Sequence, residues 1–319
     1  MISAPMPHRI FIRQVVASVV ALLFAFANKG TAQSRRMRAS DVDTIPVLDP
    51  GKRISFGSDS LNFGELRLPV GTGPFAIAIV LHGGCWYSPY ATLRNTAPLA
   101  EAITVAGVAT WNIEYRRYDQ HGGGWPGTFR DVAAAADFVR ELAKRYPIDT
   151  SRVVLVGHSA GAHLALWLAS RATLGPTSEL AVGTPMTLTG VVSIGGIADL
   201  REFYSRERAS CGNPAVESLL GGVPDSVPQR VRDASPIERL PLRVNTVHVA
   251  GERDAIAPRA VIERYADAAR AKGDTVEVVI VPDAGHFEAI VPYLPAGRAV
   301  VDAVKRLALP RAKAVRPRR

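Results

Sequence analysis

The sequence predicts an α/β fold in which helices cover both faces of a mostly parallel central sheet. Continuous apolar runs recur along the chain, and such runs are typical of strands buried on both faces of a sheet. They lie at residues 75–81, 108–113, 153–156, 188–194, 244–249 and 276–281. Helical patterns lie between them, at residues 129–145, 160–169, 258–271 and 296–307. Strands that alternate with helices favour a parallel sheet with right-handed crossovers.

Two segments depart from this alternation. Apolar and polar residues alternate over 62–68, which predicts an antiparallel strand at the edge of the sheet. Residues 199–240 are rich in Arg, Glu, Gly and Pro and contain only short apolar pieces. Because loops this long in compact domains usually serve a function, we interpret 199–240 as a cap insertion over a site at the carboxyl ends of the strands. The alternative is a long surface excursion.

The positive charge of the chain is concentrated at its two ends. The 319 residues carry a net charge of +9, but residues 1–38 hold six basic and no acidic residues, and 311–319 hold five and none. We interpret 311–319 as a solvated, disordered basic tail, and contact with nucleic acid or an anionic membrane is the alternative. No nucleic-acid-binding motif accompanies the tail, so we expect no nucleic-acid partner.

The N-terminal segment has the pattern of a signal peptide. Positive residues at 8–13 precede an uncharged apolar run at 15–27, which is shorter than the roughly 20 residues of a membrane-spanning helix. We therefore expect residues 1–32 to be removed and the protein to be exported, periplasmic or secreted, without stable membrane insertion. A buried first helix or an uncleaved anchor is the alternative. Polar residues 33–51 are expected to link this segment to one domain at 52–310.

The chain contains two cysteines, Cys85 and Cys211. Export would permit a disulfide between them, but the sequence leaves open whether they meet. Their spacing matches no metal site, and we expect neither a metal nor a cofactor.

A candidate nucleophile, Ser159, lies between an apolar strand and a helical pattern. Gly157 and Gly161 flank it in the order Gly-x-Ser-x-Gly. Glycines at both positions permit a sharp strand-to-helix turn that lifts the serine hydroxyl to the edge of the sheet. The pattern alone is weak, but its position between strand and helix favours a nucleophile over an ordinary turn.

A second glycine-containing segment, His82-Gly83-Gly84-Cys85-Trp86, follows the strand predicted at 75–81. Adjacent glycines allow backbone N–H groups to turn toward a developing oxyanion, and Ala160, which follows the serine, would supply another donor. A simple Gly-Gly turn is the alternative. We interpret His82 as a structural hydrogen-bonding residue rather than a base.

The base and the acid are expected later in the chain. His286 follows the last apolar strand, and a loop at the carboxyl end of a strand can reach Ser159. The remaining histidines lie in the signal segment, in glycine-rich loops, within a strand or too close to the serine: His8, His82, His121, His158, His163 and His248. Asp254 follows the preceding strand and is the predicted acid, with Glu252, Asp283 and Asp199 as rivals.

Together these residues indicate one chemistry. An imidazole would take the proton of Ser159, a carboxylate would orient the imidazole, the serine would attack an acyl carbonyl, and backbone N–H groups would hold the oxyanion. The order Ser159, Asp254, His286 is that of α/β-hydrolases.

From about residue 52 to 310 the chain resembles the α/β-hydrolase superfamily. Its HGG-x-W and GHSAG motifs are similar to those of the esterase branch that includes kynurenine formamidases, feruloyl-type esterases and the hormone-sensitive-lipase group. The resemblance implies that Gly83, Gly84 and Cys85 are backbone donors of the oxyanion hole. It also implies that Trp86 either lines the acyl pocket or only packs within the fold.

We therefore expect an exported serine carboxylesterase that acts on a small-molecule ester through an acyl-enzyme intermediate. An amide hydrolase of the arylformamidase or small-peptidase type, with the same triad, is the alternative. A binding module on an inactive hydrolase scaffold would be signalled by loss of the serine, the acid or the base, and each of these is present. The oligomeric state stays open.

Overall fold

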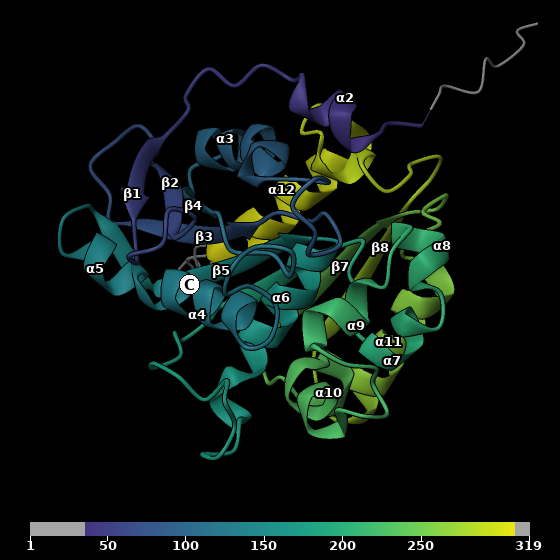
Figure 1. Cartoon of the computed structure of the whole chain (residues 1–319). Coiled ribbons are helices and arrows are strands. Elements are labelled where there is room, and N and C mark those ends of the chain that lie inside the picture. The colour runs from purple at the N-terminus through teal and green to yellow at the C-terminus, as the bar shows by residue number, and fades with distance from the viewer. Residues whose placement is uncertain (1–35, 310–319) are drawn as a thin grey trace, which may run out of the picture. The chain divides into compact units, whose positions relative to one another are not determined.

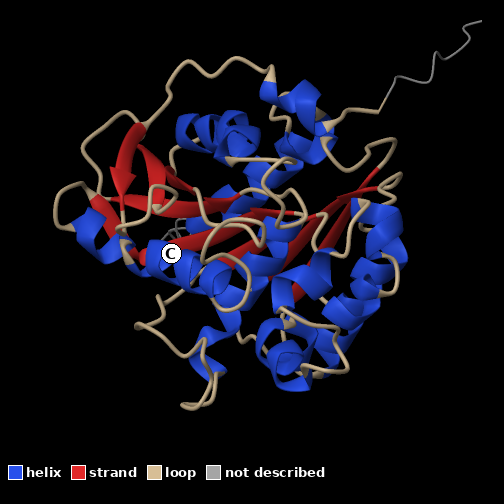
Figure 2. Cartoon of the chain, in the orientation of Figure 1, coloured by secondary structure: helices blue, strands red, loops and turns tan. Residues whose placement is uncertain are grey.

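The computed structural model describes residues 36–309, so the predicted signal peptide at 1–32 and basic tail at 311–319 lie outside the described residues. Within that range the centre is an eight-stranded sheet with the order β1-β2-β4-β3-β5-β6-β7-β8 (Figures 1 and 2). The strands are β1 (Lys52–Ser55), β2 (Phe63–Arg67), β3 (Phe75–Leu81), β4 (Ala109–Ile113), β5 (Ile148–His158), β6 (Gly190–Ile194), β7 (Thr246–Gly251) and β8 (Val276–Val281). β2 pairs antiparallel with both β1 and β4, and the six strands from β4 to β8 in the sheet order, β3 included, pair parallel, as predicted for the core.

Helices cover both faces of the sheet. They are α2 (Ala39–Asp43), α3 (Ala97–Val105), α4 (Gly127–Asp137), α5 (Val139–Ala143), α6 (Ala160–Ser170), α7 (Leu200–Tyr204), α8 (Glu207–Cys211), α9 (Ala215–Leu220), α10 (Pro228–Ala234), α11 (Arg259–Ala271) and α12 (Pro295–Ala308). Short 3₁₀ turns lie at Leu93–Thr96, Arg171–Thr173, Pro236–Arg239 and Glu288–Ile290. No helix among residues 36–309 has the length and apolar character needed to cross a bilayer.

The side chains of β3 explain why its sequence is a continuous apolar run. Ile77, Ile79 and Leu81 point to one side, into a core shared with α4, α5 and α6. Ala76, Ala78 and Val80 point to the other side, into a core shared with α3 and α12. Figure 1 shows these two helix layers on opposite sides of the sheet. Both faces of the strand are therefore buried, and both must be apolar.

The structure differs from the sequence-based expectations at two elements, the strand at 62–68 and the helix at 129–145. The strand predicted at 62–68 is antiparallel, but it is the second strand, because β1 pairs with its outer side and forms the edge. The helix predicted at 129–145 ends at Asp137 and is followed by the separate α5. The segment 199–240 contains four short helices, α7 to α10, between β6 and β7.

The expected linker at 33–51 also requires correction. Residues 39–43 form the helix α2, and Val42 is fully buried among residues of α3 and α12. The backbone N–H of Met37 donates to Glu288, and Arg94 donates to the carbonyl of Ile45. The described part of this segment is therefore packed onto the domain, because one buried valine and these hydrogen bonds hold it there.

Candidate active site

Ser159 occupies the sharp turn between β5 and α6. Its backbone has φ 54° and ψ −118°, a conformation that is unfavourable for a non-glycine residue and that persists only where the surroundings enforce it. A Cβ at Gly157 would overlap the backbone of Gly161, and a Cβ at Gly161 would overlap the carbonyls of Leu81 and His82. Both flanking positions therefore require glycine, and the turn presents Ser159 with 3% of its surface exposed.

His286 and Asp254 are directly hydrogen-bonded to each other. Nδ1 of His286 lies 2.7 Å from Oδ2 of Asp254, and the two residues are 8% and 5% exposed. The other carboxylate oxygen accepts backbone N–H groups of Ile256 and Ala257, at 2.9 and 2.8 Å. Burial raises the pKa of Asp254, but His286 and these N–H donors together lower it by more than burial raises it. The pKa of Asp254 therefore lies below its ordinary value. Asp254 is therefore a carboxylate that fixes the orientation of the imidazole.

The rival acids have other partners. Asp283 pairs with Arg253 and is largely exposed. Asp199 caps the start of α7 by accepting two backbone N–H groups. Glu252 accepts the N–H of Asp283 at 3.4 Å. Of the four candidates, the structure brings Asp254 to His286.

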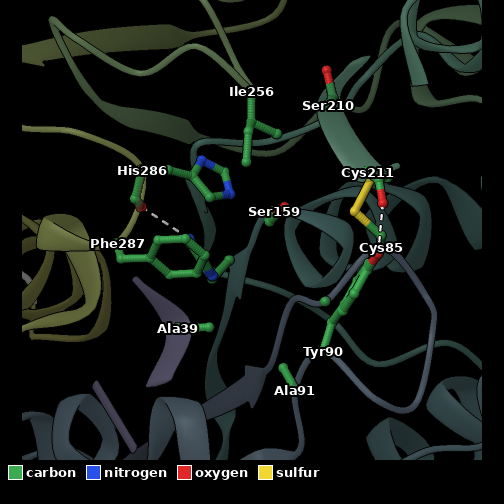
Figure 3. Close-up of a pocket in the computed structure, with 12 residues that line it drawn as sticks. Ala39, Cys85, Tyr90, Ala91, Ser159, Ser210, Cys211, Ile256, His286 and Phe287 are labelled. Atoms are coloured by element: carbon green, nitrogen blue, oxygen red, sulfur yellow. Dashed lines mark hydrogen bonds between the residues drawn. A yellow bond between two sulfur atoms is a disulfide. The ribbon is translucent and has the colours of Figure 1, made fainter. Parts of the chain in front are cut away.

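A pocket of about 270 Å³ contains the serine and the imidazole. Its walls are mostly apolar and come from seven separate stretches of the chain: Ala39, Gly84, Cys85, Tyr90, Ala91, His158, Ser159, Ser210, Cys211, Ile256, His286 and Phe287. Figure 3 shows the imidazole of His286 between Ile256 and Phe287, with Ser159 beside it. An uncharged substrate group therefore fits the pocket better than an ion.

The loop after β3 forms one side of this pocket. Gly84, Cys85 and Trp86 have φ values of +97°, +52° and +54°, and Gly84 and Cys85 contribute to the pocket wall. Gly83 lies against Ser159, since a Cβ there would be 3.0 Å from Cβ of Ser159. Ala160 begins α6, where backbone N–H groups lack partners within the helix. Gly83 and Ala160 therefore lie next to Ser159, and Gly84 and Cys85 lie in the wall of the same pocket.

A buried polar network supports this loop from beneath. Glu114 Oε1 lies 2.9 Å from Nε2 of His82 and 2.6 Å from Nη1 of Arg117. Tyr115 stacks on the ring of His82 and donates its hydroxyl to the carbonyl of His82 at 2.7 Å. Burial raises the pKa of Glu114, but His82 and Arg117 lower it by more than burial raises it, so that the pKa of Glu114 lies below its ordinary value. His82 has a structural place here, as the sequence analysis proposed.

Trp86 does not line the pocket, although it was a predicted substrate-binding residue. Its side chain is fully buried and contacts the rings of His163 and Phe203 edge-on, at centroid distances of 5.1 and 6.2 Å. The positive φ of Trp86 directs the side chain into the core beneath α6 and α7. Of the two roles considered for this residue, the structure supports packing.

Several residues of the site were given no role by the sequence analysis. His158, which belongs to the GHSAG motif, contacts the ring of His286, and Ala39, Tyr90, Ile256 and Phe287 line the pocket without belonging to a motif. Cys85 and Cys211 form a disulfide with a Cα–Cα distance of 6.1 Å. Cys211 and Ser210 belong to the predicted cap insertion, and both line the pocket.

Comparisons with known proteins identify relatives of this chain. It is 28% identical to esterase LipC of Mycobacterium tuberculosis over 244 residues, which are 74% of this chain and 59% of LipC. It is 30% identical to a kynurenine formamidase of Meyerozyma guilliermondii over 155 residues, 48% of this chain and 55% of that enzyme. The aligned regions thus span less than two thirds of the length of either relative.

Solved structures share the fold. A truncated carbohydrate esterase from gut microbiota superposes with a TM-score of 0.67 and 23% identity, over 82% of this chain and 99% of that chain. Esterase B from Lactobacillus rhamnosis, inhibited by a tributyrin phosphonate, superposes with a TM-score of 0.71 and 15% identity, over 95% and 97%. The BD-FAE family model matches residues 66–261, more than half of the chain. The chain therefore belongs to the BD-FAE family and has the α/β-hydrolase fold.

Proposed function

We propose that this protein is a serine hydrolase that cleaves carboxylic esters of small molecules. One observation carries the proposal: Ser159 lies on a strained strand-to-helix turn in the same apolar pocket as His286, and His286 is hydrogen-bonded to the buried carboxylate of Asp254. Nucleophile, base and orienting acid are the groups that acyl transfer to water requires.

In the proposed reaction, Nε2 of His286 accepts the proton of Ser159 as the oxygen attacks the acyl carbonyl. Because Nδ1 donates to Asp254, Nε2 is the ring nitrogen that is free of the proton. The carboxylate then stabilises the imidazolium, and backbone N–H groups from Gly83, Gly84, Cys85 and Ala160 are the candidates to hold the oxyanion. The imidazolium returns its proton to the leaving alcohol, and water repeats the sequence to release the acid.

The choice of an ester is supported by the relatives. Esterase LipC and the esterase structures carry that activity in their names. The kynurenine formamidase relative, at 30% identity, favours an amide hydrolase of the arylformamidase type as the second candidate. The same residues would serve both reactions, so the two candidates differ only in the substrate that the pocket accepts.

The experiment is hydrolysis of p-nitrophenyl acetate and of an N-formyl arylamine by the wild type and Ser159→Ala. We expect ester hydrolysis by the wild type and its loss in the variant, by a factor of about 10⁶ if the triad acts as a unit. A fluorophosphonate probe should label Ser159 alone. Asp254→Asn should remain folded and lose most of its activity. Full activity in Ser159→Ala would refute the proposal, and faster cleavage of the formyl amide would favour the second candidate.

We also propose that the protein is exported after cleavage of residues 1–32. The signal-like pattern of that segment and the Cys85–Cys211 disulfide support this proposal, because disulfides persist mainly in oxidising compartments. Mass spectrometry of the protein recovered outside the cytoplasm should give an N-terminus near residue 33. A chain that retains Met1 would contradict cleavage.

A further inference from the structure

The Cys85–Cys211 disulfide connects two segments that both reach the pocket. Cys85 lies in the loop that follows β3, and Cys211 is the last residue of α8, in the insertion between β6 and β7. Both cysteines line the pocket that contains Ser159. Figure 3 shows the two sulfur atoms on the side of the pocket across from His286 and Phe287. The bond therefore lies within the proposed substrate site.

On the loop side, the disulfide holds a residue with an unfavourable backbone conformation. Cys85 and Trp86 both have positive φ, although neither is glycine, and such residues persist only where their surroundings constrain them. Trp86 is constrained by complete burial, and its carbonyl accepts the N–H of Tyr118 at 3.0 Å. The corresponding constraint on the side chain of Cys85 is the bond to Cys211.

On the insertion side, the disulfide anchors a short helix. α8 has five residues, of which Glu207 and Cys211 are buried. Gly212 ends the helix in the left-handed conformation, and the carbonyl of Cys211 accepts the hydroxyl of Tyr90 at 2.8 Å. Tyr90 follows Cys85 by five residues, so both attachments join the end of α8 to the same loop. A helix this short has little stability of its own.

We propose that the Cys85–Cys211 disulfide is a positioning element of the catalytic site. It holds the backbone of the loop at 83–85 in the geometry that directs N–H groups at the oxyanion, and it holds α8 as a wall of the pocket. This inference rests on the proposed ester hydrolysis at Ser159. It adds that the rate of the chemical step depends on a bond between the loop and the insertion.

The test compares the oxidised protein with the same protein after reduction by dithiothreitol. The dithiol supplies two electrons and two protons: its thiolate attacks one sulfur of the disulfide, its second thiol completes the exchange, and Cys85 and Cys211 become thiols while dithiothreitol forms a cyclic disulfide. Mass spectrometry after alkylation of a sample should verify two free thiols before the assay. Far-UV circular dichroism should verify that the fold is retained.

We expect kcat for p-nitrophenyl acetate to fall about tenfold or more on reduction, because a displaced oxyanion donor costs transition-state stabilisation. KM should change less than kcat, and reoxidation should restore the rate. Cys211→Ser removes the bond without changing any residue of the loop, and it should have the rate of the reduced protein, with or without dithiothreitol. A purely structural role would lower the melting temperature and leave kcat at 25 °C unchanged.

The inference is overturned if the folded, reduced wild type keeps the kcat of the oxidised protein. If Cys211→Ser does not fold, the reduction and reoxidation of the wild type carry the test alone. Failure of this inference is distinguishable from failure of the proposed function. The oxidised wild type and Ser159→Ala report on ester hydrolysis, whereas the ratio of oxidised to reduced rates reports on the disulfide.

Discussion

His158 and His286 lie in contact, with ring centroids 4.6 Å apart, and Nε2 of His158 is 3.0 Å from the backbone carbonyl of His286. Since a carbonyl oxygen accepts, Nε2 of His158 carries the proton and donates. One side chain thus joins the turn that presents Ser159 to the loop that carries the proposed base. Burial, with a smaller contribution from His286, lowers the pKa of His158 to about 3, so that it stays neutral at ordinary pH.

Replacement of His158 by alanine should slow catalysis without unfolding the protein. The variant removes the hydrogen bond that holds the His286 loop, and a bond of this kind contributes about 0.5–1.5 kcal/mol, or roughly a two- to tenfold loss in kcat. His158→Gln keeps an N–H donor and should recover part of the rate. Steady-state hydrolysis of p-nitrophenyl acetate measures both. Equal rates in the alanine variant and the wild type would exclude a positioning role.

Replacement of Glu114 by glutamine should destabilise the domain strongly. The variant leaves Arg117, whose side chain is 3% exposed, without its counter-charge, and breaking a buried pair in this way costs about 3–5 kcal/mol. Glu141→Gln is the matched control, because it breaks an exposed pair with Lys144 that contributes at most about 1 kcal/mol. Urea unfolding compares the two variants. Similar losses would show that the buried network has no special importance.

The free energy of unfolding should decrease as the pH falls below about 6.5. Burial lowers the pKa of His158 to about 3 and those of His163 and His248 to about 4. Between these values and 6.5 the unfolded chain binds protons that the native chain does not, so stability is present above pH 6.5 and is lost toward pH 4. Each histidine contributes a slope of about 1.4 kcal/mol per pH unit.

Urea unfolding from pH 7 to pH 5 measures this slope. His163→Gln removes one of the titrating groups and offers an amide that can donate to the carbonyl of Ala234, the partner of His163. The variant should therefore show a shallower dependence than the wild type. A free energy of unfolding that stays constant over this range would contradict the prediction.

Replacement of Ala39 by phenylalanine should narrow the substrate range. Ala39 belongs to α2 and lines the pocket, so a larger side chain there occupies space that a bulky ester needs. We expect kcat/KM for p-nitrophenyl butyrate to fall about tenfold more than for the acetate. Ser40→Phe places the same side chain at an exposed position of α2 and should leave the ratio unchanged. Equal ratios in both variants would remove Ala39 from the substrate site.

The α/β fold and the residues proposed for catalysis could be predicted because local patterns encode them. Strands buried on both faces require continuous apolar runs, and β3 shows this with residues directed into two separate cores. Parallel strands bring their carboxyl ends to one edge of the sheet. Asp254 and His286 each follow a strand at that edge, and the structure has them hydrogen-bonded.

Other features could not be predicted, because they depend on contacts between distant segments. α2 has five residues and one fully buried side chain, Val42, which leaves no periodic pattern in the sequence. The sequence left open whether Trp86 lines the pocket or packs, and its positive φ and the rings of His163 and Phe203 hold it in the core. Neither the motif nor the composition contains that information.

The sequence by itself determined the α/β class, the serine turn with its two required glycines, and the chain order of the proposed nucleophile, acid and base. These follow from burial periodicity and from local backbone sterics, which act over a few residues. Only the tertiary structure decided that Cys85 meets Cys211 across 126 positions, that Ala39 lines the pocket, and that His158 holds the loop of His286. Such contacts depend on how packed elements approach one another in space, and no local pattern specifies that approach.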